Sequence, residues 1–92
     1  MSDAEMNAVV VGVHAALKEL DSPGFRKFRS AQGPDGKIFV CGWVSDRGEY
    51  AEERPMIGTL FAGQFVLDRV GKHQTARELI LSECSELGIA IN

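Results

Sequence analysis

Residues 37–44 read KIFVCGWV, and this stretch decides the fold. Successive side chains of a strand point to opposite faces. One face then carries two aromatic rings and a thiol, from Phe39, Cys41 and Trp43. The other face carries three aliphatic side chains, from Ile38, Val40 and Val44. Because both faces are apolar, the sequence predicts a central strand, or a strand that is covered on both sides.

Three further strands are predicted around this one. The GPDG sequence at 33–36 is a strong turn signal, because proline presets φ and glycine readily adopts positive φ. It separates a strand over 25–31 from the strand at 37–44. A polar loop over 45–55 follows, and strands are then expected over 56–62 and 65–70, with Gly63 and Gln64 in a tight turn between them.

The two ends of the chain are predicted to be helical. Residues 3–20 begin with a capping box formed by Ser2 and Glu5. Their apolar residues recur with a helical period: Met6, Val9, Val10, Val13, Leu17 and Leu20. A second helix is expected to start at Thr75 and to end before Gly88. Its apolar stripe consists of Ala76, Leu79, Ile80, Cys84 and Leu87. The apolar tail at 89–91 is expected either as an edge strand or folded back onto the core.

The expected fold is therefore α+β, with the order α-β-β-β-β-α in a single domain over 1–92. The simplest arrangement is a four-stranded antiparallel meander with the two terminal helices on one face. That arrangement leaves the other face open. Its aliphatic residues then form a candidate interaction surface: Ile38, Val40 and Val44.

Composition restricts the partners and the compartment. The 92 residues are 45% hydrophobic and 25% charged, with a net charge of −3, which disfavours a general nucleic-acid binder. The apolar stretch at 8–13 is too short to span a membrane. Asp3 and Glu5 precede it, where a signal peptide would be basic. We therefore expect a cytoplasmic protein. The alternative is a periplasmic or secreted domain whose leader has been removed.

The two cysteines offer several chemistries. In the cytoplasm, Cys41 and Cys84 should be free thiols that are buried as small hydrophobes. The alternative is a disulfide between them, which would pin the second helix to the sheet. Together with His14 and His73 they form a possible set of four zinc ligands, but no two have chelating spacing. We expect no metal, no cofactor and no catalytic residue.

Two charged segments are candidate sites. Arg26, Lys27 and Arg29 alternate with aromatic rings, a pattern found in nucleic-acid binding. In an acidic domain it favours instead a charged edge strand that resists edge-to-edge pairing. The carboxylates within 46–53 lack the spacing of a calcium loop and indicate a solvated loop.

Two segments resemble a group of small uncharacterised bacterial proteins, some of them secreted and some encoded near phage genes. The matching residues are LDSPGFR at 20–26, VCGWV at 40–44, and Tyr50. The family pattern has asparagines where this chain has Ser45 and Gly48. The resemblance implies no activity and no cofactor. Because some members are secreted, it raises the weight of the disulfide alternative.

We expect a non-enzymatic protein-interaction module that binds a protein partner or a second copy of itself. Neither nucleic acid nor a membrane is expected as a partner. One alternative is a small-ligand binder with a pocket near Trp43 and Tyr50. The other is a thiol-dependent enzyme that uses Cys41 or Cys84.

Overall fold

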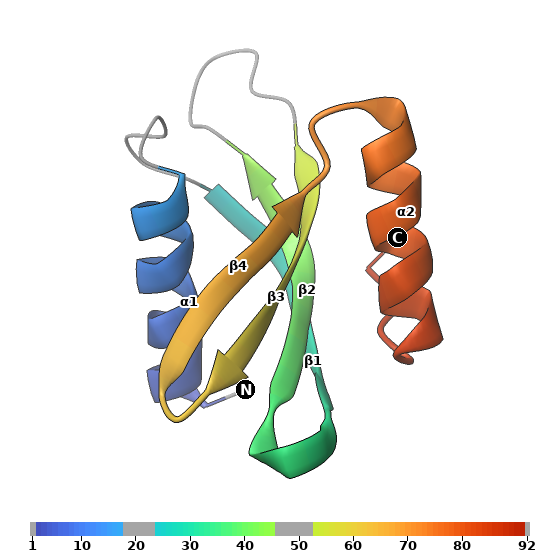
Figure 1. The fold of residues 1–92 in the computed structure, drawn as a ribbon. Helices are drawn as coiled ribbons and strands as arrows, with labels where there is room; N and C mark the ends of the chain where they lie inside the picture. Colours follow the sequence, from blue (N-terminus) through green and yellow to red (C-terminus); the bar gives the residue numbers. More distant parts are fainter. Residues whose placement is uncertain (1, 18–23, 46–52, 92) are drawn as a thin grey trace.

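The fold is known from a computed structural model that describes residues 2–17, 24–45 and 53–91 (Figure 1). Helix α1 (Asp3–Ala16) precedes the strands β1 (Gly24–Gln32), β2 (Ile38–Ser45), β3 (Arg54–Phe61) and β4 (Gln64–Val70). A one-turn 3-10 helix, η1 (Pro34–Gly36), joins β1 to β2, and helix α2 (Gln74–Glu86) follows β4. The strands form one antiparallel sheet in the order β1-β2-β3-β4. The predicted α+β class, element order and meander are confirmed.

The two helices cover opposite faces of the sheet, so the expectation that both lie on one face is wrong (Figure 1). Val40 packs with Val9 and Val13 of α1. Cys41, the next residue of β2, packs with Ile80 of α2. Neighbouring residues of a strand point to opposite faces, so these two clusters lie on opposite sides. The physical reason is that β2 is apolar on both faces, and each face needs its own cover.

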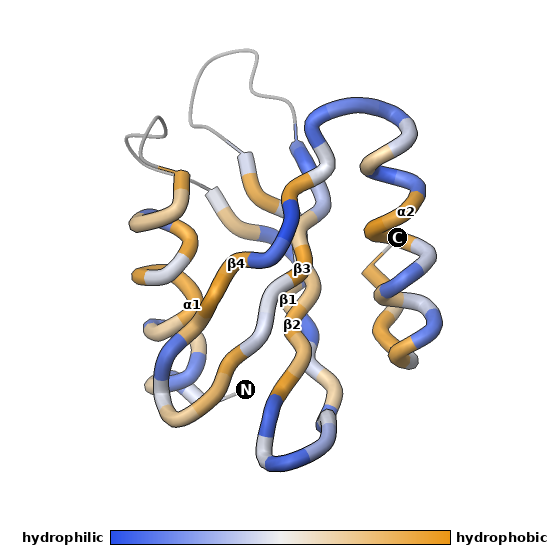
Figure 2. Tube along the Cα trace, viewed as in Figure 1, coloured by the Kyte–Doolittle hydropathy of each residue, from blue (hydrophilic) through white to orange (hydrophobic). Residues whose placement is uncertain are grey.

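The distribution of hydropathy follows this three-layer arrangement. Figure 2 shows hydrophobic residues along β2 and β3, between the two helices, and hydrophilic residues in η1 and in the segment that leads into α2. Burial of apolar side chains is therefore divided between two clusters rather than concentrated in one.

Helix α1 begins as predicted and ends earlier. The Glu5 amide donates to Ser2 Oγ at 3.2 Å, and the Ser2 amide donates to Glu5 Oε1 at 2.9 Å. These two bonds are the expected capping box. The helix ends at Ala16, not at residue 20, and Leu20 lies outside the described residues.

A β-bulge in β1 explains the glycine at the centre of β2. Arg26 pairs with Trp43 and Arg29 pairs with Cys41, so two residues of β1 lie opposite Gly42 alone. One of them is Phe28, whose ring lies over Gly42, and a Cβ at Gly42 would overlap that ring. The bulge thereby directs Phe28 into the cluster that α1 covers.

The hairpin between β3 and β4 turns one residue earlier than expected. Ala62 and Gly63 form the turn, with φ of 53° and 78°. Positive φ at both central residues is the type I′ arrangement, which matches the twist of paired strands. Gln64 therefore belongs to β4, where it pairs with Phe61.

Helix α2 begins at Gln74 and not at Thr75, because His73 is the N-cap and its Nδ1 accepts from the Ala76 amide at 3.4 Å. The predicted glycine end is confirmed: Gly88 has φ of 80°, and the Ile89 amide donates to the Cys84 carbonyl at 2.8 Å. The tail then folds back, which was one of the two expectations. Ile89 and Ile91 are buried in the same cluster as α2.

We predict that Gly42→Ala lowers the free energy of unfolding by about 1–3 kcal/mol, because the added methyl group must displace the Phe28 ring. Urea unfolding measures this cost. In a Phe28→Ala background the same substitution should cost much less, because the ring is gone. Equal costs in the two backgrounds would contradict this account of Gly42.

Candidate functional site

The predicted interaction surface on β2 is not open. Val40 and Val44 are fully buried beneath α1, and Ile38 packs against the same cluster. The expectation that this face awaits a partner is therefore wrong. It followed from placing both helices on the opposite face, whereas α1 occupies this one.

The outer surface of α1 carries an apolar stripe that is only partly covered, since Ala8 packs against the core cluster while the other members are exposed. Its members recur at offsets of 0, 4, 7 and 11, which is the spacing of one helix face: Ala4, Ala8, Val11 and Ala15. Val11 is 59% exposed although it lies at the centre of the helix. We call these four residues the α1 stripe. They lie on a different side of the helix from the buried Val9 and Val13.

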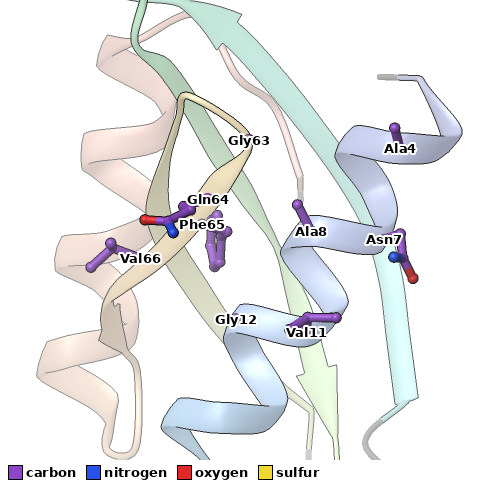
Figure 3. Close-up of a pocket in the computed structure, with 9 residues that line it drawn as sticks. All are labelled: Ala4, Asn7, Ala8, Val11, Gly12, Gly63, Gln64, Phe65 and Val66. Carbon is purple, nitrogen blue, oxygen red and sulfur yellow. The ribbon is translucent and has the colours of Figure 1, made fainter.

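A groove runs between the α1 stripe and the β3–β4 hairpin (Figure 3). It has a volume of about 440 Å³. The residues that line it come from the first three turns of α1 and from the start of β4: Ala4, Asn7, Ala8, Val11, Gly12, Gly63, Gln64, Phe65 and Val66. Figure 3 shows the Phe65 ring directed from β4 toward α1. The lining contains two amide side chains and no charged residue.

Gly12 is the reason that α1 lies so close to β4. A Cβ at this position would stand 2.5 Å from the Phe65 carbonyl oxygen and 2.8 Å from its ring. Such a contact is too short for any side chain, so glycine allows the helix backbone to rest on the strand. This close approach forms the floor of the groove.

Sequence reasoning missed the α1 stripe. Residues 8–16 read AVVVGVHAA, in which His14 is the only polar residue. A helix that is apolar nearly all round is normally buried on more than one side. The second stripe could therefore be detected from the sequence, beside the predicted stripe that contains Val9 and Val13.

A second groove of about 360 Å³ lies between the sheet and α2. Asp68, Arg69, Glu83 and Glu86 contribute to its lining beside Phe39 and Ile57. Arg69 and Glu83 form an ion pair across it. Because ionised groups border this groove, it is less suited to an apolar partner than the groove beside α1.

The predicted ligand pocket is described only in part, because Tyr50 lies outside the described residues. The Trp43 indole N–H donates to the Ile91 carbonyl oxygen. The guanidinium carbons of Arg26 and Arg77 lie 5.7 and 5.8 Å from the centroid of the Trp43 ring. Trp43 therefore anchors the tail and contacts two arginines.

Cys41 and Cys84 form a disulfide, so the preferred expectation of two free thiols is wrong and the alternative holds. Their Cα atoms lie 6.3 Å apart, and both residues are fully buried. The bond joins β2 to α2 across 43 residues of sequence. In this state neither sulfur is a nucleophile or a metal ligand.

The basic residues of β1 lie at an edge of the sheet. Arg26 Nε donates to Glu53 Oε2, and this bond holds the pKa of Glu53 below its usual 4.5. The Coulomb attraction of Arg26 and Lys27 acts in the same direction. Within residues 2–17, 24–45 and 53–91, no three His, Cys, Asp or Glu side chains are placed to hold a metal ion. The other carboxylates of the 46–53 loop lie outside the described residues.

Neither described helix is long and apolar enough to cross a membrane. No family model, no curated protein and no solved structure matches the chain. The resemblance to small bacterial proteins thus stays a prediction.

We predict that Glu53→Gln reduces the difference between the free energy of unfolding at about pH 6 and that at about pH 2.5. The pKa of Glu53 is lowered on folding, so its ion pair stabilises the protein above pH 4.5 and is lost as the pH falls through the folded pKa. The effect should be small and should weaken in high salt, because both side chains are more than 40% exposed.

Urea unfolding at the two pH values tests this, with Glu86→Gln in α2 as the matched control. The two variants should differ at the higher pH and agree at the lower one. If Glu53→Gln had the same effect at both pH values, the ion pair with Arg26 would not contribute as described.

Proposed function

We propose that the chain is a non-enzymatic protein-interaction module that associates through the α1 stripe. The observation that carries this proposal is the 59% exposure of Val11 beside an uncharged groove. An apolar helix face without a cover gains free energy when a partner removes it from water.

The two sheet edges are poor alternative contact sites. At β1, the bulge at Lys27 and the charges of Arg26 and Arg29 oppose strand pairing. At β4, α1 rests on the Phe65 carbonyl, and Asp68 forms a second bulge where the pairing with β3 shifts. Both edges thus carry features that hinder strand addition, which leaves side-chain surfaces for association.

The partner that we favour is a second copy of the chain, with the two α1 helices packed antiparallel through their α1 stripes. The described acidic residues of α1, Asp3 and Glu5, lie in its first turn. Antiparallel pairing keeps the acidic first turns of the two helices apart, whereas parallel pairing sets acid against acid. The small alanines allow two helix axes to approach closely.

Association should be weak. A helix of 14 residues is about 21 Å long, and one stripe along it covers less than the roughly 800 Å² per partner of a standard interface. We therefore expect a dimer in the micromolar range or weaker. The disulfide supports a further part of the proposal, that the protein works in an oxidising compartment.

Sedimentation equilibrium across a range of concentrations tests self-association. The wild type should shift from monomer to dimer, and Val11→Glu should raise the dissociation constant by roughly tenfold or more by placing a charge in the interface. Leu79→Glu is the matched control, because Leu79 is 55% exposed on the other helix. A wild type that stays monomeric would contradict the proposal. So would a dissociation constant that rises as much in Leu79→Glu as in Val11→Glu.

A further inference from the structure

The disulfide accounts for much of the attachment of α2 to the sheet. Ile80 and Cys84 are the residues of α2 that are buried, so one of its two anchors is a disulfide cysteine. Leu81 and Leu87 are only partly buried, and Leu79 points away from the core with 55% exposure. The chain has two cysteines, so this bond is the single covalent cross-link between α2 and the sheet besides the main chain that leads from β4 into α2.

Helix α2 and the tail form one unit, residues 74–91, which we call the α2 cover. Ile89 and Ile91 of the tail share a cluster with Ile80, and the tail is held by the bond from Trp43 to the Ile91 carbonyl. Because the tail follows directly from Gly88, loss of α2 from the sheet would also release these contacts.

The cluster on the other face contains no cysteine. Val9, Val13 and Leu17 pack there against β2 and β3. These contacts do not depend on the α2 cover, because the sheet separates the two clusters (Figure 1). The helix α1 and the sheet can therefore remain assembled when the α2 cover is released.

We propose that the Cys41–Cys84 disulfide is a redox switch that controls whether the α2 cover stays docked. With the bond intact, α2 cannot move away from β2. With the bond reduced, the contacts that still hold the cover among the described residues include side-chain packing, the Arg69–Glu83 ion pair, the bond from Trp43 to the Ile91 carbonyl and the contact of Arg77 with the Trp43 ring.

The reduction needs a dithiol as co-reactant. One thiolate of the dithiol attacks a protein sulfur, which forms a mixed disulfide and releases the other protein sulfur as a thiolate. The second thiolate of the dithiol then displaces the first protein sulfur and closes a disulfide within the reductant. Two electrons and two protons pass to Cys41 and Cys84. Because both sulfurs are fully buried, the attack requires transient opening of the cover.

Release of the cover would expose apolar side chains beside the ionised Asp68 and Arg69. Cys41, Ile57 and the half-buried Trp43 lie beneath it. In the sheet register, Phe39 pairs with Thr59 and Thr59 with Val66, so Val66 lies on this same face and is already 61% exposed. The reduced protein would therefore present a larger surface for association than the oxidised protein, on the face opposite α1.

Amide hydrogen exchange on the oxidised and the dithiothreitol-reduced wild type tests the switch. While β2, β3 and β4 stay paired, the disulfide closes a loop from Val70 to Cys84, and its loss should lower protection of the α2 amides by roughly 100-fold. Protection of the α1 amides should change only a few-fold. Trp43 fluorescence should shift to longer wavelength, because the indole ring becomes exposed to water.

A Cys41→Ala/Cys84→Ala variant serves as the control. It should resemble the reduced wild type and should not respond to dithiothreitol. Equal loss of protection in α1 and α2, in the reduced protein or in the variant, would mean global unfolding and would overturn the proposal. Unchanged protection of α2 after reduction would overturn it as well.

The result of the hydrogen-exchange experiment does not depend on self-association through the α1 stripe. Val11→Glu lies on the opposite face, so it should leave the redox response of α2 unchanged. Sedimentation of the oxidised protein and hydrogen exchange of the reduced protein thus report on the two proposals separately.

Discussion

The two apolar faces of β2 are the constraint on which the rest of the structure depends. Val40 and Cys41 are neighbours in sequence, both are fully buried, and they belong to different clusters. A strand of this kind cannot lie on the surface of a two-layer domain, because one of its faces would meet water. The chain satisfies both faces by contributing one helix from each end, and the meander places β2 and β3 between them.

The two helices are attached by different means, and this asymmetry separates the two proposals. Helix α1 is held against the sheet without a covalent cross-link, by aliphatic packing and by the close approach of Gly12 to Phe65. Its outer side is still apolar, which suits it for contact with a partner. Helix α2 has a more polar outer side and is cross-linked to β2 by the disulfide at Cys84. The proposed association and the proposed redox control therefore concern opposite faces of the sheet.

Local features were predictable from the sequence, because they depend on residues close along the chain. The Ser2 capping box, the alternation in β2 and the glycine end of α2 at Gly88 are of this kind. The choice of face for each helix was not, because a helical stripe shows that a helix packs but not against which side of a sheet. The pairing of Cys41 with Cys84 likewise depends on a distance that only the folded sheet sets. The interaction surface predicted on β2 was wrong because the sequence does not show which face of the sheet α1 covers.

The position of the Cys41–Cys84 bond in the chain also affects how the protein withstands proteases. The bond encloses the end of β2, all of β3 and β4, and most of α2 within one covalent ring. Hydrolysis of any single peptide bond between the two cysteines opens that ring but leaves one molecule, because the fragments remain joined through sulfur. Hydrolysis before Cys41 or after Cys84 instead yields two separate chains, so α1, β1 and the tail with Ile89 and Ile91 are the parts that a single cleavage leaves without a covalent connection to the rest.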